Sequence, residues 1–430
     1  MKKHRIGFIF VSFLMLCAAA ILSACDKSQG DLTEVVAGKY DLSMYETEID
    51  STTDRTQFAI RNVKEEYRDK VTTAIIPQEV QFVRASAFEG CKNLKKIIVQ
   101  GGLLMSEAVK NCENLQSIEL YDGYTSIYER VFMNCPSLEE VVLPDSVRYI
   151  GEEAFKDCTK LKSIKMADSV LIDGGAFDNT ALCDNIVDDM IYINDIAYKY
   201  VGDMPKNTAY KLREGTKNAA MYLFDNCDGL RHLILPDSME YLPSAIASDC
   251  KNLLSLTIGK SFKKINYQTG AWWRVIPIID GSPKIVEVYN RSDVEMTTDY
   301  FYTTENTLQM EILHVYNDTG HSALETRDNG QVYLVTDAEK VLVECVTDSD
   351  CIQVENGTTF LRSSFLIDCA NVSIIEIPQS VTKIEMFDFG KENYQIQYAG
   401  TMAQWNDIDK SILVDYTVCC TDGTTVKEYT

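Results

Sequence analysis

The sequence predicts an α/β repeat solenoid, rich in short strands and closed by short helical turns. Three observations predict it. Cysteines recur at 23-residue intervals at Cys112, Cys135 and Cys158. Alternating apolar residues follow each of them, and several copies then continue into a proline turn with a second apolar pair. One such unit cannot bury its apolar face alone, whereas a stack of neighbouring units can.

Each unit contains the same parts in the same order. After the cysteine comes an apolar triplet such as Leu138, Val141 and Leu143, which predicts a short strand. A turn, a second extended piece and a brief helical turn follow, and an Ala-Phe pair often ends the unit. The cysteine, with Leu or Val three residues later, marks seven copies, at Cys91, Cys112, Cys135, Cys158, Cys227, Cys250 and Cys369.

The repeated cysteines are expected to be packed thiols. Stacking at ~4.8 Å per coil places each thiol above the previous one. This spacing exceeds the ~3.8 Å between Cβ atoms that a disulfide prefers. Metal binding or redox chemistry would need convergent ligands such as CxxC, and the chain has no CxxC. Cys345 and Cys351 lie outside this pattern, and the sequence is compatible with either a disulfide or two free thiols there.

The amino terminus is a candidate export signal. A basic start, MKKHR, precedes an apolar run that is too short for an ordinary membrane-spanning helix. The run ends in Leu22-Ser23-Ala24-Cys25, which resembles a bacterial lipobox. The resemblance implies that residues 1–25 are removed as a lipoprotein signal peptide, with Cys25 acylated at the outer face of a bacterial membrane. The alternative is an ordinary secretory peptide that contains a cysteine.

The charge limits the class of partner. The formal net charge is -23, which argues against a nucleic acid partner because phosphates attract Lys and Arg. The hydrophobic content of 46% is that of a folded chain.

The repeat consensus, L-x-x-I-x-L-P-x-S-V-x-x-I-x-x-x-A-F-x-x-C, resembles the BspA-type leucine-rich repeats of bacterial surface proteins. The agreement covers residues 71–182, 216–265 and 352–385. Residues 192–215 resemble a longer irregular repeat, and the stretch from Tyr398 to Trp405 resembles a closing segment of the family. The resemblance implies a cell-surface protein that acts in adhesion or protein–protein interaction.

These signals divide the chain into six parts. The signal peptide, residues 1–25, precedes a tether and amino-terminal cap at 26–70. Leucine-rich repeats are expected at 71–265, with an irregular repeat at 183–215. A divergent, β-rich segment or insertion occupies 266–350, repeats return at 351–395, and a carboxy-terminal cap covers 396–430.

Motifs for catalysis are scarce, so we expect a protein that is not an enzyme and holds no cofactor or metal. His232 falls at an outward strand position and is interpreted as a surface residue. His314 and His321 lie in an irregular stretch that matches no hydrolase or metalloprotease motif. Gly259-Lys260-Ser261 lacks the earlier glycine of a phosphate-binding loop.

Two sets of residues are candidates for binding. The first lies at outward positions of the repeated strands, where a protein ligand is expected to bind, and consists of Lys96, Glu119, Glu140 and Lys165. The second is the pair Trp272 and Trp273, since an exposed Trp beside Arg274 could stack on a sugar or anchor a protein. Core packing of both tryptophans is the favoured interpretation. A carbohydrate-binding or substrate-capture lipoprotein is therefore the alternative function.

Overall fold

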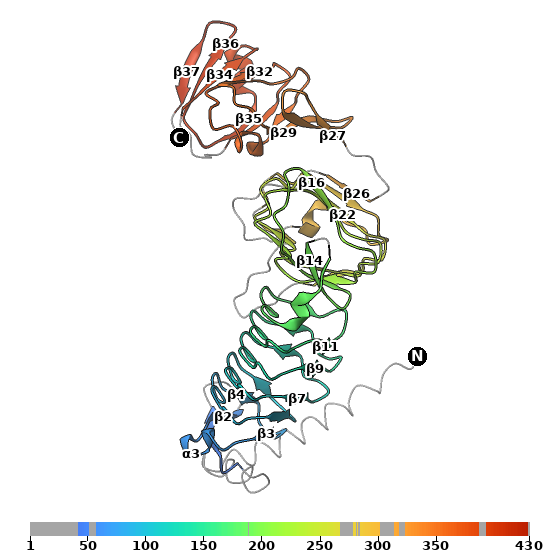
Figure 1. Cartoon of the computed structure of the whole chain (residues 1–430). Coiled ribbons are helices and arrows are strands. Elements are labelled where there is room, and N and C mark those ends of the chain that lie inside the picture. Colours follow the sequence, from blue (N-terminus) through green and yellow to red (C-terminus); the bar gives the residue numbers. More distant parts are fainter. Residues whose placement is uncertain are drawn as a thin grey trace, which may run out of the picture. The chain divides into compact units, whose positions relative to one another are not determined.

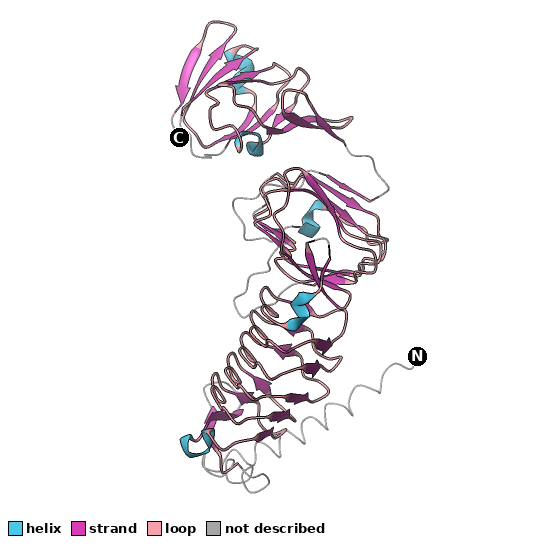
Figure 2. Cartoon of the chain, viewed as in Figure 1, coloured by secondary structure: helices cyan, strands magenta, loops and turns pink. Residues whose placement is uncertain are grey.

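Strands and turns dominate both parts of the protein (Figures 1 and 2). The structure is a computed structural model of the 430-residue chain. It describes residues 42–50, 57–187, 189–266, 278–280, 282, 284–301, 314–317, 323–386 and 393–428. The chain forms two compact units. The first contains residues 1–201 and 218–223, and the second contains residues 202–217 and 224–430.

The first unit begins with an antiparallel hairpin that covers one end of its core. Strand β1 (Tyr45–Asp50) pairs with β2 (Gln57–Val63), and the short helix α3 (Glu65–Arg68) follows. Strand β2 then pairs in parallel with β4 (Phe82–Val83), the first short strand of the repeats. Phe58, Ile60 and Val63 are buried on the inner side of the hairpin.

The repeats behind this hairpin form stacked coils (Figure 1). Each coil contributes one long strand and one short strand, and within two groups of coils the strands of the same kind pair in parallel. The long strands are β3 (Thr73–Ile76), β5 (Lys96–Val99), β7 (Ser117–Leu120), β9 (Glu140–Val142) and β11 (Ser163–Lys165). The short ones are β4, β6 (Leu103–Leu104), β8 (Ser126–Ile127), β10 (Tyr149–Ile150) and β12 (Leu171–Ile172). The predicted strand-rich solenoid is confirmed.

The closing segment of each coil is a run of hydrogen-bonded turns. In one coil the Ala154 N–H donates to the Gly151 carbonyl (3.2 Å), and the Cys158 N–H donates to the Phe155 carbonyl (3.1 Å). Glu153 (φ 54°) and Asp157 (φ 63°) adopt the left-handed conformation and interrupt any regular helix. The same two positions are left-handed at Glu107 and Asn111, and at Arg130 and Asn134. The turns also pair with the next coil, so they form a third ladder between coils.

The repeated cysteines point into the core. Cys91, Cys112, Cys135, Cys158, Cys250 and Cys369 are buried free thiols, while Cys227 is half-buried. Each thiol after the first of a series donates to a carbonyl of the preceding coil, as from Cys112 to Phe88 (3.2 Å) and from Cys158 to Phe132 (3.1 Å). Burial raises the pKa of the Cys112 and Cys250 thiols to about 12, so they stay neutral. The prediction of packed thiols is confirmed for these six; Cys345 and Cys351 are also free.

A row of aromatic rings runs beside the thiols. Phe132 stacks on Phe155 with ring centroids 5.3 Å apart, and Phe155 stacks on Phe177 at 5.5 Å. Tyr198 meets Phe177 edge-on and ends the row. Tyr198 belongs to an antiparallel meander that interrupts the coils at the end of the first unit. The 3-10 turn η1 (Ala181–Asp184) precedes the meander, which consists of β13 (Ile186–Val187), β14 (Met190–Ile193) and β15 (Ile196–Tyr200). Strand β15 then pairs in parallel with β17 (Asn218–Ala219).

The second unit resumes parallel stacking. Its main sheet contains β16 (Thr208–Lys211), β19 (Leu230–Ile234), β22 (Ser255–Ile258), β25 (Glu287–Asn290) and β26 (His314–Tyr316). Two smaller sheets contain β18 (Phe224–Asp225), β21 (Ala247–Ser248) and β24 (Ile279–Asp280), and β20 (Tyr241–Pro243) with β23 (Lys264–Asn266). The 3-10 turn η2 (Thr298–Phe301) lies between β25 and β26 along the chain.

An antiparallel meander then precedes the last coils. It consists of β27 (Leu324–Thr326), β28 (Gln331–Val335) and β29 (Lys340–Cys345). Strand β29 pairs in parallel with β31 (Phe360–Leu361), and β33 (Lys383–Met386) and β35 (Asp409–Ile412) follow in the same sheet. The 3-10 turn η3 (Ser363–Leu366) comes after β31 in the chain. The other sheet contains β30 (Cys351–Gln353), β32 (Ile374–Ile377), β34 (Tyr394–Tyr398), β36 (Tyr416–Cys420) and β37 (Thr425–Glu428).

The carboxy-terminal segment is built around one tryptophan. Helix α4 (Met402–Asn406) begins with a capping box between Thr401 and Gln404. It carries Trp405, which is fully buried between Tyr398 and Tyr416. The domain boundaries expected from the sequence stay a prediction.

A buried group of charges ties the meander to the coils of the second unit. The Lys284 ammonium is fully buried and donates to Asn252 Oδ1 (2.7 Å) and Glu344 Oε1 (2.5 Å), and it also pairs with Asp368. Glu344 also forms an ion pair with Arg231. Burial alone would raise the pKa of Glu344, but the hydrogen bond from Arg231 and the charge of Lys284 lower it below its ordinary value.

We expect Glu344→Gln to lower the free energy of unfolding by about 3 to 5 kcal/mol, because it leaves buried cations short of a partner. Glu344 contributes fully above the ordinary glutamate pKa and loses this contribution as pH falls through its lowered value. Denaturant unfolding of the variant should therefore depend less steeply on pH in acid.

The matched control is Glu325→Gln, which removes an exposed ion pair with Arg327 and should cost less than about 1 kcal/mol. Equal losses in the two variants would contradict the structural role of the buried group.

Candidate functional site

The outward side chains of the long strands form a mixed polar and apolar surface in the first unit. Along β9 the burial alternates, so Val141 is 3% exposed whereas Val142 is 62% exposed. Val142 lies opposite Lys165 in the register, and Glu140 lies opposite Ser163. The outward set from β3 to β11 consists of Thr73, Ile75, Lys96, Ile98, Ser117, Glu119, Glu140, Val142, Ser163 and Lys165.

Two of the four candidate residues on this surface are partners of each other. The Lys96 ammonium lies 2.5 Å from Glu119 Oε1 across β5 and β7, with both side chains largely in solvent. Such an exposed pair contributes less than about 1 kcal/mol. Glu140 and Lys165 form no ion pair within the described residues and are exposed. Their charges are therefore available to a partner at little cost in stability.

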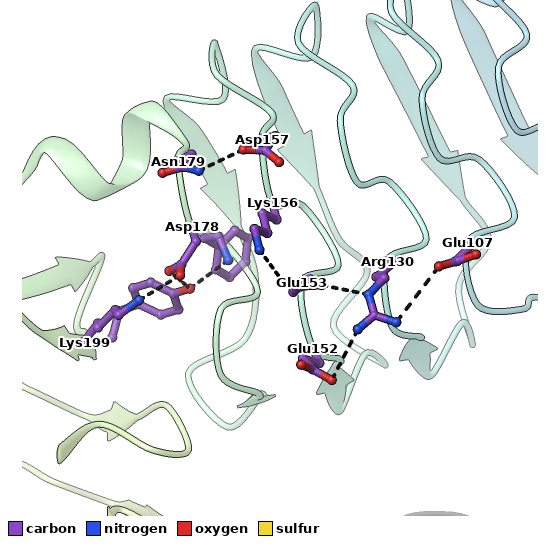
Figure 3. A network of polar contacts seen from close by, with 11 residues as sticks. Glu107, Arg130, Glu152, Glu153, Lys156, Asp157, Asp178, Asn179 and Lys199 are labelled. Carbon is purple, nitrogen blue, oxygen red and sulfur yellow. Dashed lines mark hydrogen bonds and ion pairs between the residues drawn. The ribbon is translucent and has the colours of Figure 1, made fainter. Parts of the chain in front are cut away.

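Charged side chains at the closing turns of the first unit pair with one another in networks within the chain (Figure 3). Arg130 Nε lies 2.7 Å from Glu153 Oε2, and Lys156 also pairs with Glu153. Further along, the Lys199 ammonium lies 2.7 Å from Asp178 Oδ2. The Arg130–Glu153 pair joins neighbouring coils through their closing turns, the Lys156–Glu153 pair lies within one turn, and the Lys199–Asp178 pair joins β15 to the last coil. We interpret them as stabilising contacts.

The main sheet of the second unit has a row of polar residues on its outward face. That these residues lie side by side was not predicted from the sequence. Neighbouring strands β19, β22, β25 and β26 place His232, Ser255, Glu287 and His314 side by side. His232 Nδ1 lies 2.8 Å from Ser255 Oγ. Burial, followed by the charge of Arg231, lowers the pKa of His232. The spacing of His232 and Ser255, one 23-residue period, could have predicted this contact from the sequence.

This row lacks the geometry of a serine hydrolase. A catalytic serine needs a histidine base that is itself oriented by a carboxylate. Here the carboxylate of Glu287 lies beside Ser255, on the side away from His232, and it accepts from Tyr289 (2.6 Å). Burial raises the pKa of Glu287. Ser255 is also only 5% exposed, so the row supplies no accessible nucleophile.

Three of the predicted site residues lie outside the described residues: Cys25, Trp272 and Trp273. Over the ranges that the structure describes, no group of three or more His, Cys, Asp or Glu side chains could hold a metal ion. None of the helices described is long and apolar enough to cross a bilayer.

Comparison with known proteins identifies the family of the repeats. A model of the BspA type leucine rich repeat region matches six copies, over residues 65–183, 102–204 and 185–269. Residues 65–269 of the chain are BspA-type leucine-rich repeats. No curated protein shows significant similarity to it.

Three solved structures illustrate what the chain is similar to. A leucine rich cell surface protein from Faecalibacterium prausnitzii is 18% identical, with 84% of this chain and 89% of that chain covered and a TM-score of 0.28. A leucine-rich repeat protein from Bacteroides ovatus is 17% identical, with coverages of 88% and 100% and a TM-score of 0.31. The pneumococcal vaccine antigen PcpA is 14% identical, with coverages of 87% and 96% and a TM-score of 0.29.

Proposed function

We propose that this protein is a binding protein of the bacterial cell surface, held at the outer face of the membrane by acylated Cys25. It recognises a protein partner with the outward side chains of its long strands. The repeat family supports a role in protein interaction. The lipobox-like LSAC sequence supports export and acylation.

The observation that carries the binding face is the exposure of Val142 between unpaired charges. Val142 is 62% exposed at the end of β9, which pairs in parallel with β11, and the outward Ile75 of β3 is 45% exposed. Glu140 and Lys165 lie next to Val142 and are exposed. Interfaces combine an apolar centre with a polar rim, and this arrangement has both on a rigid support.

The binding face is tested by replacing Val142 with a photo-crosslinking residue in the full-length, membrane-anchored protein. We expect one partner protein to be captured, and we expect Val142→Asp to weaken binding of the purified partner at least tenfold, because a charge is then buried at the contact. Thermal stability should change little, since the side chain is exposed.

The matched control is Val346, an equally apolar residue that is 57% exposed near the β27–β29 meander. A crosslinker there should capture nothing, and Val346→Asp should leave binding unchanged. Normal binding by Val142→Asp, Glu140→Lys and Lys165→Glu would contradict the assignment of this face.

The anchor is tested separately with Cys25→Ser. We expect this variant to accumulate as unprocessed precursor or to appear in the medium, and to lose incorporation of a labelled fatty acid. Two acyl chains hold a protein firmly because each buried CH₂ contributes about 0.8 kcal/mol. Membrane retention and labelling at the level of the unmodified protein would remove the lipoprotein assignment.

A further inference from the structure

A groove of about 490 Å³ lies on the sheet formed by β30, β32, β34 and β36. It follows the outward face of these strands near their carboxyl ends, where Ala399 and Thr421 contribute to its wall. The register places Gln353, Glu376, Gln397 and Cys419 in one row across the four strands. Neighbouring side chains in the row are therefore about 4.8 Å apart.

The groove is poor in charge. Among the thirteen described residues that line it, Glu376 alone carries a charge, although 24% of the residues in the chain are charged. Four of the lining side chains are amides, from Asn356, Gln353, Gln395 and Gln397. The ligand that fits this lining is polar but uncharged.

Two of these amides are free to bind. Gln395 and Gln397 are exposed, and their side chains make no hydrogen bond within the described part of the chain. Gln353 donates to Glu376 Oε2 (3.1 Å), which fixes the orientation of both side chains. Each amide presents two donors and an acceptor that accepts two bonds. The amides of the groove can therefore pair with several hydroxyl groups at once.

The groove also lacks what a protein partner needs. Its large apolar lining residues are buried, with Val354 5%, Ile377 1% and Tyr398 3% exposed. Protein interfaces rely on aromatic or aliphatic anchors that fill a desolvated pocket. No described lining residue offers such an anchor, which favours a hydroxylated ligand over a polypeptide.

From these observations we propose that the groove binds a neutral glycan, a chain of uncharged hydroxylated sugar units. The amides of Gln353, Gln395 and Gln397 bond its hydroxyl groups, and the exposed methyl of Ala399 contacts its CH groups. This site is separate from the protein-binding face around Val142. Loss of one activity therefore leaves the other intact.

The test is affinity electrophoresis of the full chain through gels that contain a neutral mannan, galactan, α-glucan or β-glucan, with heparin as the charged comparison. We expect at least one neutral polysaccharide to retard the protein. The double variant Gln395→Ala/Gln397→Ala should weaken this binding about tenfold or more, because each lost hydrogen bond reduces affinity about two- to tenfold. The matched control, Gln116→Ala, removes an exposed glutamine of the first unit and should bind normally.

Glu376→Gln separates the ligand classes. It removes the charge and keeps the shape, so binding of a neutral glycan persists. If this variant instead abolishes binding of a cationic peptide that the unmodified protein retains, the groove is a peptide site and the proposal is wrong. Failure of all four neutral polysaccharides to retard the protein, or unchanged retardation of the double variant, overturns it as well.

Discussion

In-register stacking is the constraint on which the remaining structure depends. Each coil repeats the backbone of the coil before it, so that every inward side chain lies directly over its counterpart, as Ile164 does over Val141. A side chain at such a position has to be compact and must leave no polar group unpaired. A cysteine meets both conditions, because its sulfur is small and its thiol donates to a carbonyl of the preceding coil, as in Cys158 to Phe132. The 23-residue spacing of the cysteines follows from this requirement.

The same constraint leaves one set of side chains without a structural task. Successive residues of a strand point to opposite faces, so packing restricts Val141 and leaves Val142 unrestricted. Charges that stabilise the stack are placed at the closing turns, where Arg130 and Glu153 join neighbouring coils. The outward face can therefore change its chemistry from coil to coil. In one region it carries Val142 between charges, and in another it carries the exposed glutamines Gln395 and Gln397.

Much of the repeat could be predicted from the sequence because its contacts are local or fall one period apart. The packed thiols and the alternation along the strands were predicted in this way. The hydrogen bond between His232 and Ser255 and the row from Gln353 to Glu376 were missed, although both join residues 23 apart in sequence. Predicting these two contacts would have required applying the repeat period to outward positions as well as to inward ones.

Other contacts could not be predicted, because no period links their residues. Lys284 meets Glu344 sixty residues later and Asp368 eighty-four residues later. This contact depends on how the β27–β29 meander packs against the coils of its unit. The pairing of Lys96 with Glu119 was missed for a different reason: the register places Lys96 opposite Ser117, so the pair lies on a diagonal across two strands and two candidate binding residues are partly occupied by each other.

The central claim is that stability comes from the inward side chains and that the outward ones are free to serve recognition. The most direct test compares the unfolding free energies of Ile164→Asp and Lys165→Asp, which place the same charge at adjacent residues on opposite faces of β11. Ile164 is 3% exposed and Lys165 is exposed. The account predicts a loss of at least about 3 kcal/mol, or failure to fold, for Ile164→Asp. It predicts a change within about 0.5 kcal/mol for Lys165→Asp. Comparable losses in both variants would contradict it.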